Sequence, residues 1–181
     1  MSETRPLWLV GMMGAGKSTL GPVIAARLRR RFVDTDQEIE RRARASIPGI
    51  FEAEGESGFR VREAEVVASL EGSGAVVALG GGALGQAAVR ERLLQSGIVV
   101  YLEASPESLV ERVGEAEDRP LLRGRSREER LRRIRELLSE REAEYRQAHI
   151  TLNTEVWDVE ALAAELEERL APIGADSEKT A

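Results

Sequence analysis

The stretch at 11–19 reads GMMGAGKST, and it directly follows the apolar run LWLV at 7–10. It completes the pattern G-x-x-x-x-G-K-[ST], whose glycines let backbone N–H groups turn around an anion. The residues that follow have helical spacing, so the positive end of a helix would point at the same anion. Strand, loop and helix together predict a nucleotide phosphate site, in which Lys17 reaches the phosphates and Ser18 ligates Mg²⁺.

Lys17 is notable because lysine is rare in this chain. Only two of the 26 basic residues are lysines, Lys17 and Lys179, and the others are arginines. A compact ammonium on a flexible stem suits a phosphate cradle, whereas a planar guanidinium suits carboxylates and exposed surfaces. The composition therefore supports a specific role for Lys17.

Length and composition limit the classes of protein to consider. The 181 residues suit one domain, and the absence of cysteine excludes a disulfide framework and thiolate metal sites. A net charge of −6 and a pI of about 5.1 argue against a general nucleic-acid binder. The start MSETRPLW lacks the pattern of a signal peptide, and no apolar run reaches about 18 residues. We expect a soluble, cytoplasmic protein without membrane or nucleic-acid partners.

Apolar runs of strand length alternate with segments of helical spacing along the chain. Strands are predicted at 7–10, 32–33, 75–79, 98–102 and 149–152. Helices are predicted at 19–31, 37–44, 50–54, 58–70, 83–95, 106–113, 128–148 and 159–170. The alternation predicts a parallel sheet with helical crossovers, and ligands then bind beyond the carboxyl ends of the strands.

Two segments lack these patterns. Residues 114–128 are charged, contain Pro120 and Gly124, and show no clean apolar period, which predicts a mobile lid. The small and polar tail at 172–181 is predicted to be disordered. The rest of the chain, 1–171, shows no internal repeat and no linker, so we expect a single domain.

Two carboxylates, Asp34 and Asp36, follow the second predicted strand. At a strand end, one carboxylate can face a metal while the other faces an acceptor substrate. We assign Asp34 to the Mg²⁺ shell, through water, and Asp36 to binding or deprotonating an acceptor hydroxyl. The alternative is that one of them only caps the helix expected from Gln37, since Asp favours that position.

Two arginines occupy positions that are unusual for a cation. Arg141 falls within an apolar stripe of the helix at 128–148, where a guanidinium must meet a protein carboxylate or a ligand anion. Arg60 lies at a predicted helix start, where the helix dipole disfavours a cation. An anionic ligand would explain Arg60, and so would an exposed side chain. The residues alone leave both alternatives open for each arginine.

Three further features follow from the local sequence. Arg119, beside Pro120, could close over a transferring phosphate or only keep the lid soluble. The triple glycine at 80–82 has no side chains, so a substrate could contact its backbone N–H groups directly. A tight turn would also use glycine. His149 is the only histidine and heads a predicted strand, so we expect a structural role for it.

Together these residues resemble the shikimate kinase family, within the nucleoside monophosphate kinase group of P-loop proteins. The resemblance extends from 7 to 170. It is carried by GMMGAGKST at 11–19, DTD at 34–36, IFEAEGESGFRVRE at 50–63, LGGG at 79–82, RPLL at 119–122 and Arg141-x-x-x-Tyr145. It implies an α/β P-loop NTPase fold with about five parallel strands, in the order 2-3-1-4-5, flanked by helices. It also implies a substrate-binding region at about 35–62 and a mobile lid at about 114–128.

The resemblance implies an activity, the ATP-dependent phosphorylation of the 3-hydroxyl of shikimate on the pathway to chorismate and aromatic amino acids. The residues implied in shikimate binding are Asp36, Arg60, Gly81, Gly82 and Arg141. The two arginines would pair with the shikimate carboxylate, because a guanidinium fork matches a carboxylate. Asp36 and the glycine backbone would hold the hydroxyls, and Glu63 would organise Arg60.

On the nucleotide side, the resemblance implies ATP as co-substrate and Mg²⁺ as cofactor, held by Ser18 and Asp34. Lys17, Asp36 and Arg119 would be the catalytic residues, with Arg119 contacting the transferring phosphate. The residues implied in ATP binding are Gly14, Ala15, Gly16, Lys17, Ser18, Thr19, Arg112, Arg119 and Asn153.

Two other functions fit parts of the pattern. A kinase for another small hydroxy acid, such as gluconate, would share the scaffold, but GE-x-x-F-R and LGGG favour shikimate. A nucleotide-dependent switch would share the phosphate loop, but the sequence has no N-K-x-D segment to read guanine. No long exposed apolar stripe requires a partner chain, so we expect a monomer.

Overall fold

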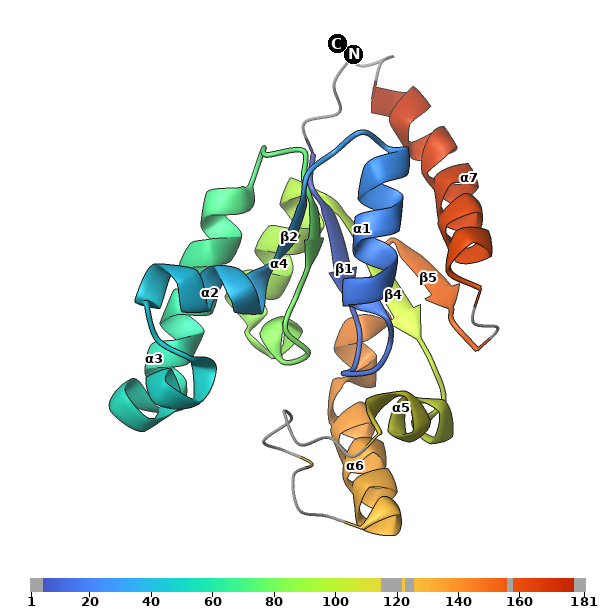
Figure 1. Ribbon diagram of the computed structural model, residues 1–181. Coiled ribbons are helices and arrows are strands. Elements are labelled where there is room, and N and C mark those ends of the chain that lie inside the picture. Colours follow the sequence, from blue (N-terminus) through green and yellow to red (C-terminus); the bar gives the residue numbers. More distant parts are fainter. Residues whose placement is uncertain (1–4, 115–121, 123–125, 156–157, 178–181) are drawn as a thin grey trace.

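The computed structural model describes residues 5–114, 122, 126–155 and 158–177, and it contains a five-stranded sheet in the order β2-β3-β1-β4-β5. All paired strands run parallel (Figure 1). The strands are β1 (Leu7–Val10), β2 (Phe32–Asp34), β3 (Val76–Ala78), β4 (Ile98–Glu103) and β5 (Ile150–Asn153). The predicted number, direction and order of the strands are therefore confirmed.

β1 lies at the centre of the sheet and is buried over its whole length. Leu7 is in register with Val76 of β3 on one side and with Ile98 of β4 on the other. Trp8, the next residue, is fully buried. Both faces of the strand are thus apolar, as expected for a parallel strand covered by helices on both sides.

Helices cover both faces of this sheet. α1 and α7 pack against each other on one face, while α4 and α6 lie on the other face (Figure 1). The helices are α1 (Lys17–Arg27), α2 (Thr35–Ala43), α3 (Ile47–Leu70), α4 (Ala87–Ser96), α5 (Pro106–Val113), α6 (Arg127–Tyr145) and α7 (Val159–Ser177), with a 3₁₀ turn η1 (Ala83–Gly85) before α4. In the described part of the chain, none of the helices combines the length and the apolarity needed to cross a membrane.

The start of α2 is set by Asp34. Its Oδ1 accepts hydrogen bonds from the backbone N of Asp36 (3.0 Å) and of Gln37 (3.5 Å). The helix therefore begins at Thr35, earlier than the predicted start near Gln37. The carboxylate that caps the helix is Asp34, which leaves the Asp36 side chain for another role.

The sequence predicted an interruption between the helices at 37–44 and 50–54, and a second one between 50–54 and 58–70, around Gly55. The first interruption is present but shorter than predicted, because Ser46 Oγ accepts a hydrogen bond from Gly49 N (3.3 Å) and caps a helix that begins at Ile47. Gly55 has a φ of 69° and kinks α3 at the point where the separation was predicted.

The end of α1 also differs from the prediction. The helix ends at Arg27 rather than Arg31. Arg29 takes a left-handed φ of 54°, and Arg30 N donates to the carbonyl of Ala25 (2.8 Å). These features close the helix in the manner of a left-handed C-terminal cap, which the sequence did not reveal because no glycine marks it.

The prediction of a disordered tail at 172–181 is wrong for 172–177, because α7 continues through Ser177. Pro172 lacks one backbone donor, but tertiary contacts can carry a helix past a single missing hydrogen bond. Ile173 packs against the core, and its carbonyl accepts a hydrogen bond from Arg5 Nη2 (3.4 Å). Residues 178–181 lie outside the described residues.

Most of the predicted lid at 114–128, including Arg119 and Pro120, lies outside the described residues. Leu122 is described and is fully buried. α6 begins at Arg127, inside the predicted lid, with a capping box formed by Ser126 and Glu129, so the last residues of that segment are helical. The mobility of the lid stays a prediction.

His149 links the two strands at the edge of the sheet. Its Nδ1 accepts a hydrogen bond from the backbone N of Val99 in β4 (3.0 Å), immediately before β5 begins. Only an unprotonated Nδ1 can accept this bond. Partial burial, together with the charge of Arg5, lowers the pKa of His149. The contact agrees with the structural role expected for this residue.

We expect the substitution His149→Asn to remove part of the pH dependence of stability. A pKa that is lowered on folding stabilises the protein fully above the unfolded value of about 6.5, and this contribution is lost as the pH falls through the folded-state pKa. The Asn amide oxygen can accept from Val99 N without titrating. The Tm of the wild type should therefore fall more than that of the variant between about pH 7.5 and about pH 5.5. Equal losses of Tm in the two proteins would contradict this role.

Candidate active site

The loop at 11–16 connects β1 to α1, and Gly16 occupies the N-cap position of the helix. Gly16 has a φ of 100°, a left-handed conformation that glycine adopts without strain. No side chain caps α1 within the described chain, so the first N–H groups of the helix can bind an anion. This is the backbone geometry of a phosphate-binding loop.

The side chain of Lys17 lies over this loop. Its Nζ donates hydrogen bonds to the backbone carbonyls of Gly11 (2.8 Å) and Met12 (2.9 Å). These contacts hold the ammonium group against the loop that follows β1. A phosphate bound by the N–H groups of the loop would meet this positive charge at short range.

Ser18 and Asp34, the two predicted Mg²⁺ ligands, lie next to each other. Ser18 Oγ donates a hydrogen bond to Asp34 Oδ2 (2.9 Å), while the other carboxylate oxygen caps α2. The described residues contain no group of three or more acidic, histidine or cysteine side chains placed to hold a metal ion. A hydroxyl and one carboxylate suit Mg²⁺, which keeps several waters and takes further oxygen ligands from nucleotide phosphates.

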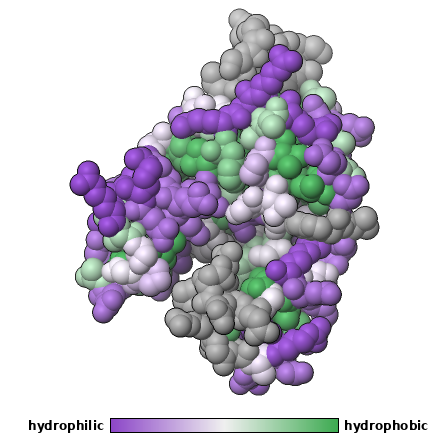
Figure 2. Space-filling model, in the orientation of Figure 1, coloured by the Kyte–Doolittle hydropathy of each residue, from purple (hydrophilic) through white to green (hydrophobic). Residues whose placement is uncertain are grey.

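The carboxyl ends of β2, β3 and β1 point toward a hollow between α3 and α6 (Figures 1 and 2). Asp36 lies at this edge, against the triple glycine that follows β3. A Cβ atom added to Gly80 would lie 2.9 Å from Asp36 Oδ1 and 3.1 Å from Glu63 Oε1. A larger residue at this position would displace the Asp36 carboxylate, so glycine allows both carboxylates to pack against this turn.

Arg60, on α3, lies over the third glycine of the same turn. A Cβ atom on Gly82 would lie 2.7 Å from Arg60 Nη2. The guanidinium donates hydrogen bonds to Glu63 Oε2 (2.8 Å) and to Glu56 Oε1 (3.2 Å). Burial alone would lower the pKa of Arg60, but the charges of Glu63 and Glu56 raise it, so the guanidinium remains charged.

Glu63 is fully buried and holds Arg60 in place. Its Oε2 also accepts a hydrogen bond from Gln86 Nε2 (2.9 Å), whereas its Oε1 has no partner within the described chain. Burial raises the pKa of the Glu63 carboxyl, and the charge of Arg60 opposes that shift. The contact between Glu63 and Arg60 agrees with the organising role expected for Glu63.

Arg141, on α6, contacts the middle glycine of the turn. Its Nη1 donates a hydrogen bond to the carbonyl of Gly81 (3.0 Å), and Tyr145 donates its hydroxyl to the same oxygen (2.6 Å). In the described part of the chain, no carboxylate forms an ion pair with Arg141. The hydrogen bond of Arg141 is thus to a backbone carbonyl, and a ligand anion as its partner stays a prediction.

Two aromatic residues beside Arg60 were not singled out from the sequence. The rings of Phe51 and Phe59 are 4.9 Å apart between centroids, and Arg60 Cζ lies 5.4 Å from the centre of the Phe59 ring. Phe51 is 39% exposed, which is unusual for a large apolar side chain. The sequence signal was weak, since it consisted only of two of the three phenylalanines lying on one helix.

On the nucleotide side, Arg112 of α5 donates a hydrogen bond to Thr154 Oγ1 (3.0 Å) and another to the carbonyl of Thr154. Asn153, which directly precedes Thr154, makes a different contact: its Oδ1 accepts a hydrogen bond from Glu155 N (2.8 Å), and its neighbour in register is Glu103. Arg119, the third predicted contact of this group, lies outside the described residues.

The fold and this edge of the sheet define a phosphotransferase of the P-loop class, with a phosphate loop beside an arginine-rich acceptor site. The shikimate kinase family model matches residues 13–171. A shikimate kinase of Thiobacillus denitrificans is 47% identical over 156 residues, which cover 85% of this chain and 84% of that protein. One of Pseudoalteromonas translucida is 45% identical and covers 94% of this chain and 99% of that protein. The chain belongs to the shikimate kinase family.

Solved structures agree with this assignment. The shikimate kinase of Acinetobacter baumannii in complex with shikimate superimposes with a TM-score of 0.87 at 42% identity, covering 94% of this chain and 95% of that one. A gluconokinase of Sinorhizobium meliloti has a TM-score of 0.61 at 18% identity. The second likeness shows a shared fold and does not support gluconate as the acceptor.

Proposed function

We propose that this enzyme transfers the γ-phosphoryl group of ATP to the 3-hydroxyl of shikimate, forming shikimate 3-phosphate and ADP on the pathway to chorismate and aromatic amino acids. The observation that carries the proposal is the convergence of Asp36, Arg60 and Arg141 on the triple glycine at 80–82. These side chains come from three separate helices and meet beside the phosphate loop. A structure of a 42% identical relative with shikimate bound supports the choice of acceptor.

The acceptor site matches the chemistry of shikimate. The guanidinium groups of Arg60 and Arg141 bind its carboxylate, because planar N–H forks pair with carboxylate oxygens. Asp36 accepts a hydrogen bond from the reacting hydroxyl, and the backbone of Gly81 and Gly82 holds the other hydroxyls. Positioning the hydroxyl in line with the γ-phosphorus supplies much of the rate enhancement, so no covalent intermediate is needed.

The residues around the phosphate loop stabilise the negative charge that moves onto the phosphate oxygens during phosphoryl transfer. Lys17 and the N–H groups at the start of α1 bind the phosphates, and Ser18 and Asp34 hold Mg²⁺. When bound, Mg²⁺ offsets the negative charge of the β- and γ-phosphate oxygens. Arg119 contacts the transferring phosphate from the lid. We also propose that Arg112 and Asn153 lie near the adenine.

We further infer that the protein acts as a monomer in the cytoplasm. The acidic composition, the absence of cysteine and the lack of a membrane-crossing helix among the described residues support this inference. A size-exclusion and light-scattering measurement would test the monomer.

An assay of ADP release with ATP and Mg²⁺ tests the proposed acceptor. We expect shikimate to stimulate ADP release strongly, and gluconate to give no more than the rate without an acceptor. The acceptor site explains this difference, since its glycines and two arginines form a compact site for a cyclic hydroxy acid. Equal stimulation by gluconate would favour the alternative substrate. Slow hydrolysis that no acceptor changes would favour a nucleotide-dependent switch instead.

A further inference from the structure

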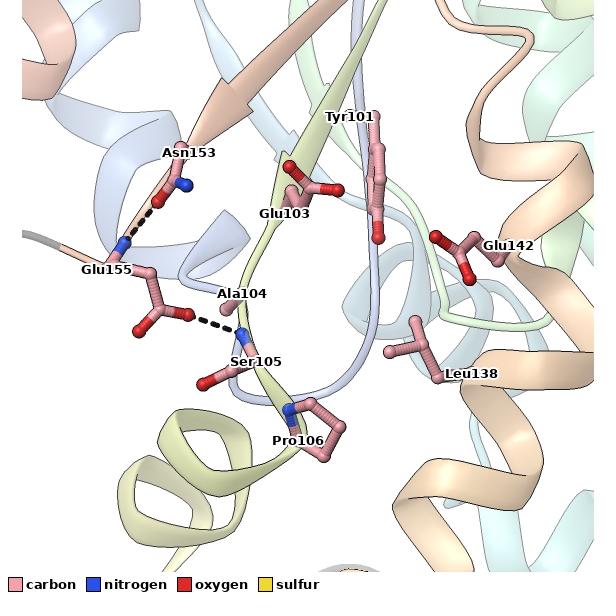
Figure 3. A pocket seen from close by; sticks show the side chains of 9 residues that line it. All are labelled: Tyr101, Glu103, Ala104, Ser105, Pro106, Leu138, Glu142, Asn153 and Glu155. Carbon is pink, nitrogen blue, oxygen red and sulfur yellow. Dashed lines mark hydrogen bonds between the residues drawn. The ribbon is translucent and has the colours of Figure 1, made fainter.

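Among the residues that the structure describes, Glu63 is the only carboxylate buried from solvent. An exposed carboxylate of the same fold shows the difference. In the pocket beyond the ends of β4 and β5, Glu155 accepts a hydrogen bond from the backbone N of Ser105 (Figure 3). Water can satisfy the remaining lone pairs of Glu155, whereas a buried carboxylate depends on groups of the protein. The donors around Glu63 therefore fix the position of its charge.

Two donors converge on the same oxygen of Glu63. Its Oε2 accepts hydrogen bonds from Arg60 Nη1 (2.8 Å) and from Gln86 Nε2 (2.9 Å). Arg60 belongs to the acceptor site, but Gln86 was not singled out from the sequence, because a glutamine before a helix is no signal of a site. Within the described chain, its amide is the neutral side-chain donor to Glu63.

The backbone of Gln86 is held on both sides. Its N donates a hydrogen bond to the carbonyl of Ala83 in η1 (3.3 Å), and its carbonyl accepts one from Arg90 N in α4 (2.9 Å). The half-buried side chain crosses from there to α3, which packs against α4. Gln86 thereby ties the segment that follows the triple glycine to the helix that carries Arg60.

The amide of Gln86 determines which way the Glu63 carboxylate faces. The terminal torsion of a glutamate is broad and roughly two-fold, so a single donor leaves the two oxygens interchangeable. With both donors on Oε2, the other oxygen faces Gly80, where an added Cβ atom would lie 3.1 Å from Oε1. The Arg60 guanidinium then has a defined place over Gly82, where an added Cβ atom would lie 2.7 Å from Nη2.

The neutrality of this donor matters for the charge of the acceptor site. A second cation beside Glu63 would compete with Arg60 for the carboxylate. The amide instead satisfies Glu63 through a hydrogen bond and leaves Arg60 as the cation that pairs with it. Arg60 is thus held by Glu63 through Nη1, while its Nη2 lies against the glycine turn.

We propose that Gln86 is a positioning residue of the acceptor site. Its amide orients Glu63, and Glu63 holds the Arg60 guanidinium where it meets the acceptor carboxylate. The inference rests on the proposed function, because it needs an acceptor that carries a carboxylate. Arg60 binds the acceptor away from the reacting hydroxyl, so the loss of Gln86 weakens ground state and transition state equally, which raises KM and leaves kcat.

The substitution Gln86→Met tests this role, because methionine keeps an unbranched side chain and removes the amide. With saturating ATP, we expect KM for shikimate to rise about fivefold and kcat to stay within about twofold of the wild type. KM for ATP should not change. Gln95→Met is the matched control, since Gln95 is an exposed residue of the same helix, α4, and its kinetic constants should equal those of the wild type.

The substitution Gln86→Glu gives a second readout, which depends on pH. A carboxyl at this position lies against Glu63 Oε2, where two negative charges repel, so the pair keeps one proton at low pH and still forms a hydrogen bond. When that proton leaves, the introduced carboxylate competes for Arg60. The ratio of KM for shikimate between this variant and the wild type should therefore rise from about two at about pH 6 to at least about ten at about pH 8.5. The charged groups on the surrounding elements are the same in both proteins: Glu56 and Arg60 of α3, Asp36 of α2, Arg90 of α4 and Arg141 of α6.

The outcomes separate the role of Gln86 from the proposed function. A wild type whose ADP release shikimate does not stimulate would overturn both. A wild type that uses shikimate, together with an unchanged KM in Gln86→Met or with kcat and both KM values altered alike, would overturn the role of Gln86 alone. A KM ratio of Gln86→Glu that is flat with pH would do the same, and this comparison holds even where Gln86→Met fails to fold.

Discussion

Replacing Lys17 by methionine should lower kcat by about 10³-fold, with a smaller loss of ATP affinity. Lys17 is the basic residue that the structure holds against the phosphate loop, through Nζ contacts to Gly11 O and Met12 O. Negative charge moves toward the leaving oxygen during transfer, so a fixed ammonium stabilises the transition state more than the ground state. Methionine keeps an unbranched stem of similar length and removes the ammonium group, with its charge and its N–H donors. Steady-state ADP release with saturating ATP and acceptor measures the effect.

The sequence itself provides a matched control for this experiment. Lys179→Met removes the only other lysine of the chain, so it makes the same change in net charge. We expect kcat of this variant to remain at the wild-type value. The variant Lys17→Arg should stay severely impaired, because a planar guanidinium does not fit a cradle shaped for a compact ammonium. Retention of more than about a tenth of kcat in Lys17→Met would remove Lys17 from its proposed role.

The sheet could be predicted from the sequence because its signal is local. Each strand is a short, nearly continuous apolar run, and the run at 7–10 leads directly into GMMGAGKST. The helix starts were less accurate, since Asp34 and Asp36 are equally good caps in sequence. Which of the two caps the helix depends on where β2 ends, and in the structure Asp34 accepts the hydrogen bonds from the first N–H groups of α2. The end of α7 was predicted too early, because a proline such as Pro172 usually ends a helix. The helix continues past it, and Ile173 packs against the core, which the sequence does not reveal.

The sequence named individual candidate residues of the site, but not how they are arranged. The sequence identified Arg60 and Arg141 as cations without an evident partner, and left their partners open. The fold brings both to the triple glycine at 80–82, which requires α3, α6 and the end of β3 to meet.

The substitution Arg141→Ala should weaken shikimate binding by about 2–5 kcal/mol, typical of truncating one partner of a buried charge pair. ATP affinity should change little, because the contact of Arg141 with Gly81 lies on the acceptor side of the site. The fold should survive the change, since Tyr145 still donates its hydroxyl to the carbonyl of Gly81 (2.6 Å). Separate binding titrations with shikimate and with an unreactive ATP analogue measure the two affinities.

Arg133→Ala is the matched control for this experiment. Arg133 lies on the same helix and pairs with Glu136 at the surface (3.1 Å), so its loss removes a charge without touching the site. Shikimate affinity of this variant should equal that of the wild type. Equal weakening of both ligands by Arg141→Ala would indicate a general disturbance of the fold and refute the assignment. A loss confined to shikimate would instead establish Arg141 as the residue of α6 that recognises the acceptor carboxylate.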